Sequence, residues 1–458
     1  MATENRLTSI PSFSEAARLW AYIGCINFGG PAGQIAMMHR LLVDEKKWIS
    51  DARYFHALNY CMLLPGPEAQ QLATYVGWLM HGVKGGLVAG LLFIVPGALV
   101  MLGLSILYVN YSDLTVVSAI FYGIKAAVLA IVIEAILRIG KRAFTGPAMI
   151  WIATGAFAAL FFLAAPFPLV VLAAALTGFF GMKYAPEQFR ASGHAAKGGV
   201  SGDGFAVDDA FARGELAHTK TTRGRTGLTI AVWGLIWLLP VVVLAAWLGG
   251  DSVFTKLAVF FSTMSVVTFG GAYAVLAYVA QEAVATYQWL SAAEMLDGLA
   301  LAETTPGPLI LVLQHVGFLA AFRQAGIDPL LAGVLGAMVT LWVTFAPSFL
   351  WIFAGAPYAE RVRENRALSA ALAAITAAVV GVILNLAIWF ALHVLFGTVD
   401  VVTFGPLQVH TPDVLTLDVA ALGLALVAAV ALIRFKMPVL ALLGLCAALG
   451  LTVRYLAI

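Results

Sequence analysis

Long apolar runs separated by short polar turns dominate the sequence. The runs that are long enough to cross about 30 Å of hydrocarbon as single helices fall at 84–109, 114–138, 227–248, 328–355 and 368–396. Two pairs of shorter runs follow the same logic, at 147–164 with 167–182 and at 416–433 with 437–456. The pattern predicts an all-α polytopic membrane protein whose surface lies mainly in the lipid bilayer.

One polar segment divides the apolar runs into two halves. Residues 183–225 hold seven basic and five acidic side chains, with Gly and Ser and almost no large apolar residue. This composition is typical of a flexible linker, and a regulatory or ligand-binding role is the alternative. We therefore divide the chain into four parts, which are a first transporter repeat at 1–182, a cytoplasmic linker at 183–226, a connecting helix at 227–250 and a second repeat at 251–458.

The two halves share short motifs at a constant spacing, which indicates a duplicated module. Three motifs recur 241 residues later, Phe28-Gly29-Gly30 as Phe269-Gly270-Gly271, Trp48-Ile49-Ser50 as Trp289-Leu290-Ser291, and Pro65-Gly66-Pro67 as Pro306-Gly307-Pro308. A further match follows at an offset of 251, where Ala126-Ala127-Val128 recurs as Ala377-Ala378-Val379.

The distribution of basic residues predicts that the repeats have opposite orientations. In the first half, 40–53 and 138–142 are basic, whereas 110–114 has no Lys or Arg. In the second half, 281–296 has none, whereas 361–366, the counterpart of the uncharged turn, has three arginines. Because basic loops stay on the cytoplasmic side, the repeats are expected to be inverted. Inverted repeats with broken or re-entrant helices around a midplane site are typical of secondary transporters.

The repeated Gly and Pro turns are the strongest candidates for a binding site. Pro and Gly interrupt helices, and the helix that starts after each turn has N–H groups without partners at its positive end, where an anion can bind. Irregular backbone is tolerated in a membrane only where it is buried or lines a wet cavity. The alternative is close helix packing or a kink. The candidate substrate-binding residues at these turns are Gly29, Gly30, Gly33, Gln34, Pro65, Gly66, Pro67, Gln70, Gln71, Gly270, Gly271, Thr304, Thr305, Pro306, Gly307 and Pro308.

Four ionisable residues within apolar runs complete the candidate site. Lys125 lies midway along 114–138, and an intramembrane lysine marks function by default. We expect it to bind an oxyanion, with snorkelling or an ion pair with Glu68 as the alternative. Glu68, Glu303 and His315 are the candidate proton carriers, because burial raises the pKa of a carboxyl group and histidine titrates near neutrality. A purely structural hydrogen bond is the alternative for His315.

Composition and missing motifs exclude several other functions. The chain is 62% hydrophobic and 11% charged, and its net charge of +2 is too small to indicate nucleic-acid binding. The three cysteines have no C-x-x-C spacing, so neither a disulfide framework nor a metal site is expected. H-E-x-x-H, G-x-S-x-G and the phosphate-binding loop are all absent from the sequence. We therefore predict neither an enzyme nor an ATP-driven pump, and no cofactor.

The turns resemble those of a known transporter family. Leu64-Pro-Gly-Pro-Glu-Ala-Gln-Gln-Leu72, Ala302-Glu-Thr-Thr-Pro-Gly-Pro-Leu309 and the Phe-Gly-Gly repeats are together similar to the chromate ion transporter family in its long, two-module form. The resemblance implies proton-motive-force-driven export of chromate across the bacterial inner membrane, and hence chromate resistance. Import of sulfate, which has the same tetrahedral dianionic shape, is the first alternative. A scaffold or receptor acting through the linker is another, and a homodimer stays open.

Overall fold

The computed structural model describes residues 9–189, 204–219, 222–269, 272–358 and 366–456. Gly270, Gly271, most of the basic turn at 361–366 and the linker residues 190–203 therefore lie outside the described residues. Seven of the described helices are long and apolar enough to cross a membrane. Each of the five long apolar runs in the sequence corresponds to one of these seven helices or to part of one. This agreement confirms the all-α membrane fold.

The first half and the linker contain eleven described helical segments. They are α1 (Phe13–Ile26), α2 (Gly30–His39), the π-helix η1 (Arg40–Glu45), α3 (Asp51–Cys61), α4 (Glu68–Tyr111), α5 (Thr115–Ala143), α6 (Pro147–Leu163), α7 (Phe167–Tyr184), α8 (Pro186–Phe189), α9 (Ala206–Ala212) and the 3₁₀ helix η2 (Ala217–Thr219). The longest of these, α4, has non-helical backbone at His81 and Gly82, so it consists of a short helix followed by a long one.

The second half begins with a helix that has no counterpart in the first. Its elements are α10 (Arg223–Leu248), α11 (Val253–Val267), α12 (Ala272–Gln281), η3 (Glu282–Thr286), α13 (Ala292–Thr304), η4 (Leu309–Leu311), α14 (Val312–Gln324), α15 (Pro329–Gly355), η5 (Ala356–Tyr358), α17 (Arg366–Leu395), β1 (Val399–Phe404), β2 (Leu407–Pro412), η6 (Val414–Thr416), α18 (Val419–Ala429), η7 (Val430–Arg434) and α19 (Val439–Leu456). The hairpin β1–β2 follows α17, where the sequence analysis expected no strand.

The order of elements repeats along the chain, as the motifs predict. In the first half the order is α1, α2 with its π-helical end η1, α3, the Pro-Gly-Pro turn, the short first part of α4, and the long helices of α4 and α5. In the second half it is α11, α12 with η3, α13, the Pro-Gly-Pro turn, η4 and α14, and the long helices α15 and α17. Ser50 and Ser291, which close the equivalent Trp-x-Ser motifs, cap α3 and α13 by accepting hydrogen bonds from Arg53 and Glu294 backbone N–H groups. The two Trp-x-Ser motifs therefore mark the starts of equivalent helices, α3 and α13.

The two halves interlock instead of lying side by side. Helix α17 packs against α5, α6 and α7 of the first half, and α18 and α19 pack against α5. Glycines allow the backbones to approach closely at these contacts. A Cβ atom at Gly123 would collide with the carbonyl of Cys446, and one at Gly381 would collide with the carbonyl of Ala153. The buried core therefore runs continuously across both halves.

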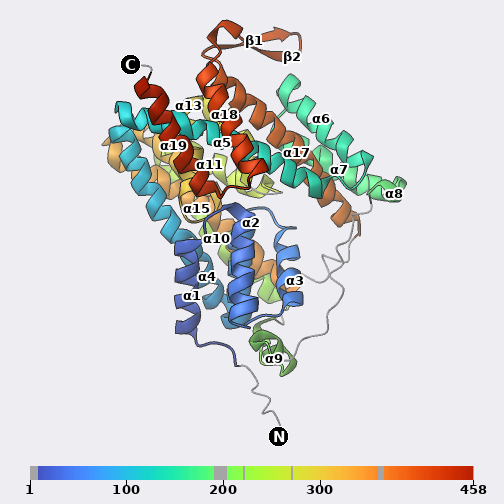
Figure 1. The fold of residues 1–458 in the computed structure, drawn as a ribbon. Helices are drawn as coiled ribbons and strands as arrows, with labels where there is room; N and C mark the ends of the chain where they lie inside the picture. The colour runs from blue at the N-terminus through green and yellow to red at the C-terminus, as the bar shows by residue number, and fades with distance from the viewer. Residues whose placement is uncertain (1–8, 190–203, 220–221, 270–271, 359–365, 457–458) are drawn as a thin grey trace.

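The linker is more ordered than its composition suggests. Residues 204–219 pack on the first half, where the buried Asp208 carboxylate pairs with Arg53 Nε at 2.8 Å and accepts the Ser50 N–H at 2.9 Å. The ring of His218 contacts Trp78 edge to face. The prediction of a flexible linker is therefore wrong for this segment. Figure 1 shows α9 at one end of the molecule and the β1–β2 hairpin at the other.

Candidate functional site

Each Pro-Gly-Pro turn joins two short helices that the structure keeps separate. Helix α3 ends at Cys61 and α4 begins at Glu68, directly after the first turn, as the sequence predicts. Helix α13 ends at Thr304, and η4 and α14 follow the second turn. The central glycines have positive φ angles, +117° at Gly66 and +104° at Gly307, which side-chain-bearing residues rarely adopt. The repeated glycine is therefore required by the backbone of the turn.

The two turns are held by reciprocal hydrogen bonds between the halves. Gly66 N–H donates to the carbonyl of Thr268 at 2.9 Å, and Gly307 N–H donates to the carbonyl of Asn27 at 3.2 Å. Asn27 and Thr268 each precede a Phe-Gly-Gly motif, and both pairs of positions differ by 241. Each Pro-Gly-Pro turn therefore binds the backbone before the Phe-Gly-Gly motif of the opposite repeat.

The long helices α4 and α15 approach these turns in an equivalent way. Each contains a proline, at Pro96 and Pro347, followed by a small residue that contacts the opposite turn. A Cβ atom at Gly97 would collide with the carbonyl of Pro306, and one at Gly66 would lie 3.1 Å from Ser348 Oγ. Small residues are therefore needed where the helices cross the turns.

A cavity lies between the reciprocal turns. Its empty volume is about 330 Å³ including its open side. The residues that line it are Pro31, Gln34, Gly66, Pro67, Glu68, Ala69, Thr268, Ala272, Pro308, Leu309 and Ile310. The structure therefore brings together five of the residues predicted from the sequence, namely Gln34, Gly66, Pro67, Glu68 and Pro308.

Gln34 connects the wall of this cavity to both repeats. The side chain is fully buried, and Nε2 donates to the carbonyls of Asn27 at 2.9 Å and Gly307 at 2.6 Å. Because both carbonyls only accept, this arrangement fixes which end of the amide carries the nitrogen. Its Oε1 atom has no hydrogen-bond partner within the described part of the chain.

Glu68 is the ionisable residue on the cavity wall. It is the first residue of α4, after Pro67, so its carboxyl group lies at the positive end of that helix. The side chain forms no hydrogen bond or ion pair with other residues that the structure describes, and only the charge of Arg142 acts on it from a longer distance. The cavity thus combines an unpaired carboxyl group with the N–H groups of a helix start.

Several other predicted residues stabilise the turns without lining the cavity. Gln71 Nε2 donates to the carbonyl of Pro65 at 2.7 Å, and Gln70 Nε2 donates to Thr74 Oγ1 at 3.3 Å. The hydroxyl groups of Thr304 and Thr305 donate to the carbonyls of Leu301 and Ala302, one turn earlier in α13. Gly29 and Gly30 start α2 with φ angles of +91° and +68°. Gly33, Pro65 and Pro306 are likewise absent from the lining residues.

Glu303 is buried close to the cavity but does not line it. Its Oε1 atom accepts a hydrogen bond of 2.7 Å from the hydroxyl of Tyr273. Tyr273 lies on α12 next to Ala272, which does line the cavity. Glu303 and Glu68 therefore differ, because Glu303 has a neutral hydrogen-bond donor and Glu68 has none among the described residues.

Lys125 and His315 lie in a different cluster from the one that we expected. Lys125 Nζ pairs with Asp297 Oδ1 at 3.2 Å, so a carboxylate of the protein already balances its charge. His315 is fully buried, its Nδ1 atom lies 2.9 Å from Ser105 Oγ, and its ring contacts Tyr108 edge to face. The ion-pair partner of Lys125 is therefore Asp297 and not Glu68, and binding of an oxyanion by Lys125 stays a prediction. The missing partner, Asp297, is an acidic residue within the apolar run 295–301.

Comparisons with known proteins agree with the duplicated architecture. The profile of the family described as Chromate transporter matches residues 14–179 and 255–451, one segment in each half. The chain is similar to a chromate transport protein of Pseudomonas aeruginosa, with 30% identity over 83% of this chain and 82% of that protein. It is also similar to a chromate transport protein of Cupriavidus metallidurans, with 27% identity over 79% and 78% of the two chains.

A third relative extends the match over nearly the whole chain. It is a probable chromate transport protein of Synechococcus elongatus, with 24% identity over 90% of this chain and 95% of the relative. No solved structure matches the chain. Since the family profile covers most of both halves, the chain belongs to the chromate transporter family.

Proposed function

We propose that this protein is a secondary transporter that exports chromate across the bacterial inner membrane, driven by the proton-motive force, and so confers chromate resistance. The observation that carries the proposal is the cavity between the reciprocal turns. Its wall contains the N-terminus of α4, the unpaired carboxyl group of Glu68 and backbone from both repeats. Such a site can bind a small oxyanion and can change its access when the repeats move relative to each other.

The positions of equivalent helices support inverted repeats. Helix α3 begins beside α9 of the linker, through the Arg53–Asp208 pair. The long part of α4 begins at Gly82, beside His218 of the same linker. Helix α13, the equivalent of α3, instead contacts Tyr108, near the other end of α4. At about 1.5 Å per residue, the roughly 26 residues from Gly82 to Tyr108 span about 39 Å, which is close to the thickness of a membrane. We infer that α3 and α13 start at opposite membrane faces.

The membrane potential favours export of a dianion. Moving one elementary charge through 100 mV changes its free energy by about 2.3 kcal/mol, so a dianion leaving a negative interior gains about 4.6 kcal/mol per 100 mV. Import of sulfate would move the same charge against the membrane potential, so it would require cotransport of cations to offset this electrical free energy. This electrical term is the reason for preferring export to the sulfate-import alternative.

Proton coupling is assigned to Glu68, Glu303 and His315. The Glu68 carboxylate and an oxyanion compete for the same positive helix end in the cavity. We propose that the anion leaves on the outer side and that a proton then binds to Glu68 for the return step. Glu303, whose hydroxyl partner is Tyr273, is the second proton carrier in this scheme.

Counterflow in inverted membrane vesicles tests the proposal. Labelled chromate, sulfate and molybdate are compared before and after collapse of the pH gradient and of the membrane potential. We expect chromate to accumulate, and we expect accumulation to fall when either gradient is removed. Accumulation of sulfate without chromate would make sulfate the exported ion, and movement of sulfate only out of the inverted vesicles would favour the import alternative. The absence of all three fluxes would refute oxyanion transport.

A further inference from the structure

A buried ion pair joins the two repeats at a distance from the cavity. Lys125 lies on α5 of the first repeat and Asp297 on α13 of the second. Their side chains are only 22% and 7% exposed. An ionised pair inside a membrane is costly, and it persists where it has a function. Neither residue lines the cavity at the Pro-Gly-Pro turns.

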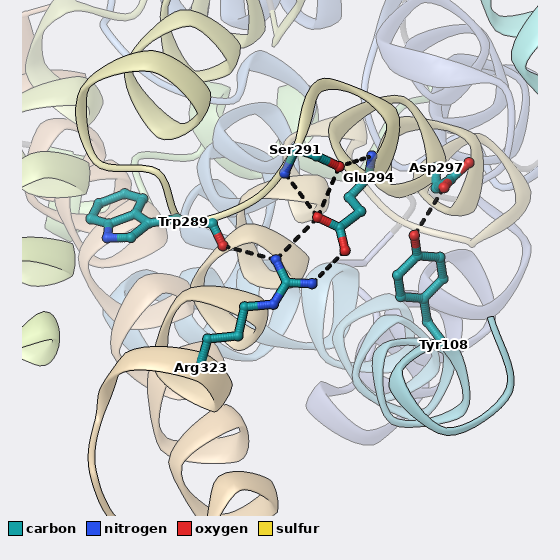
Figure 2. A network of polar contacts seen from close by, with 6 residues as sticks. All are labelled: Tyr108, Trp289, Ser291, Glu294, Asp297 and Arg323. Atoms are coloured by element: carbon teal, nitrogen blue, oxygen red, sulfur yellow. Dashed lines mark hydrogen bonds and ion pairs between the residues drawn. The ribbon is translucent and has the colours of Figure 1, made fainter. Parts of the chain in front are cut away.

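The two oxygens of Asp297 have different partners. Tyr108 of α4 donates its hydroxyl to Oδ2 at 2.9 Å, as Figure 2 shows. Oδ1 faces Lys125 Nζ and has no hydrogen bond within the described part of the chain. In the same view Glu294, one turn earlier on α13, is instead bound by Ser291 and Arg323. Among the residues that the structure describes, Asp297 thus pairs with Lys125 alone for a compensating charge.

Few other ionisable groups surround this pair. His315 of α14 lies close by, because its ring contacts Tyr108 and packs against Gly298. Arg323 of the same helix is occupied by Glu294. Of the other helices that pack on α13, α4 contributes Tyr108, and α17 and α19 carry no acidic or basic residue at 367–392 and 439–453. A change in charge at Asp297 is therefore felt mainly by Lys125.

Separation of the repeats has opposite consequences for the two ionisation states of Asp297. If α13 moves away from α5 while Asp297 is ionised, two unpaired charges are left in a low-dielectric environment. If Oδ1 has taken up a proton, the carboxyl group is neutral and only Lys125 keeps a charge. Tyr108 can still donate to Oδ2 in either state. Proton binding and separation of the pair therefore favour each other by thermodynamic linkage.

We propose that Asp297 is a proton-coupling residue and that its pair with Lys125 is a latch between the repeats that proton binding releases. The proposal rests on the transport function proposed above and adds a residue to it. In the step, Asp297 Oδ1 binds one proton and the ammonium group of Lys125 is released without giving up its own proton. The latch closes again when the proton leaves to the opposite side of the membrane.

The test compares two kinds of flux through the full-length protein in proteoliposomes. Chromate exchange at equilibrium needs no net proton movement, whereas accumulation against a gradient does. The variants are Asp297→Asn, the charge-balanced double variant Lys125→Met with Asp297→Asn, and Asp251→Asn as a matched control. Asp251 is an exposed carboxylate that also pairs with a lysine, Lys256, at 3.6 Å.

We expect the latch variants to separate exchange from accumulation. Asp251→Asn keeps both fluxes. The double variant keeps exchange within about threefold of the wild type, accumulates at least tenfold less chromate, and shows a weaker dependence of exchange on pH, because Glu68 is unchanged. If Asp297→Asn alone loses exchange through the uncompensated Lys125 charge, the double variant restores it.

Two outcomes would overturn the latch. One is gradient-driven accumulation at the wild-type level in either Asp297 variant. The other is loss of exchange in both variants while they remain monodisperse, because the pair would then serve substrate binding. Failure of the transport function itself is distinguishable, since wild-type protein would then exchange no chromate.

Discussion

Replacing Gly66 by alanine tests whether the reciprocal turns form the transport site. Gly66 has a φ angle of +117°, which strains any residue with a side chain. The new Cβ atom would also lie 2.8 Å from Gln71 Nε2 and 3.1 Å from Ser348 Oγ. Gln71 must then move away from the carbonyl of Pro65, to which it donates. The substitution therefore disturbs the turn without adding charge or polarity.

The expected cost follows from these two effects. Backbone strain of this kind costs about 1–3 kcal/mol, and the lost hydrogen bond of Gln71 costs about 1 kcal/mol. Together they weaken the formed turn by about 2–4 kcal/mol. Because about 1.4 kcal/mol corresponds to a tenfold change in an equilibrium constant, we expect transport at least tenfold slower than in the wild type.

The assay is the initial rate of labelled chromate uptake into inverted vesicles, normalised to the amount of protein in the membrane. Gly326→Ala is the matched control. Gly326 also has a positive φ angle, +70°, in the turn between α14 and α15, and a Cβ atom there meets nothing within 4 Å. It should lose stability through strain but keep its transport rate. Wild-type transport by Gly66→Ala, or equal losses in both variants, would refute this account of the site.

Three further predictions concern the cavity wall and the docked linker. Gln34→Leu removes both amide hydrogen bonds, including the one to Gly307, and should destabilise the protein by about 1–3 kcal/mol; an unchanged melting temperature in detergent would contradict this. Asp208→Asn should raise hydrogen exchange in α9 because it removes a buried charge pair, whereas Glu215→Gln, at an exposed pair, should not. Burial lowers the pKa of His218 below 6.5, so the undocked linker binds the proton more readily, and docking should weaken as pH falls below about 6.5. Protection of η2 from exchange, corrected for the intrinsic rate at each pH, that is equal at about pH 7.5 and about pH 5.5, or unaffected by His218→Gln, would exclude this mechanism.

Patterns that repeat or punctuate the chain predicted most of the fold. Proline and glycine at 65–67 located the start of α4 at Glu68, because these residues exclude helix by backbone geometry alone. The offset of 241 identified the equivalent turns, and the same offset relates the hydrogen bonds that hold them. Such features depend on local sequence, so they can be read without knowing what lies nearby in space.

Partners from distant parts of the chain could not be predicted in the same way. The sequence suggests an oxyanion or Glu68 of the same repeat as the partner of Lys125, whereas the observed partner, Asp297, lies in the opposite repeat. The available signal was that Asp297 is itself an acidic residue in an apolar run, so each intramembrane charge predicts the existence of the other. Which ones meet is decided by how α13 packs on α5.

The linker and the hairpin show a second limit, which is set by composition. Residues 183–225 contain few apolar residues, so their composition does not indicate that some of them anchor the segment. The anchoring residues are Val207, Ala210 and Leu216, which are all buried. Strand β1 is mostly exposed, β2 is mostly half-buried, and both lie between apolar helices. The signal was three valines before Gly405 and one after it, but a few β-branched residues carry little weight beside long apolar runs.

The reciprocal hydrogen bonds also set an order of events during synthesis. The acceptor for Gly66 is the carbonyl of Thr268, which the ribosome makes much later, in the second repeat. At about 5–20 residues per second, the roughly 200 residues between them take about 10–40 s to synthesise. During that interval the N–H group of Gly66 has to be satisfied by water or by the insertion machinery. Biogenesis therefore finishes the first repeat only after the second has entered the membrane.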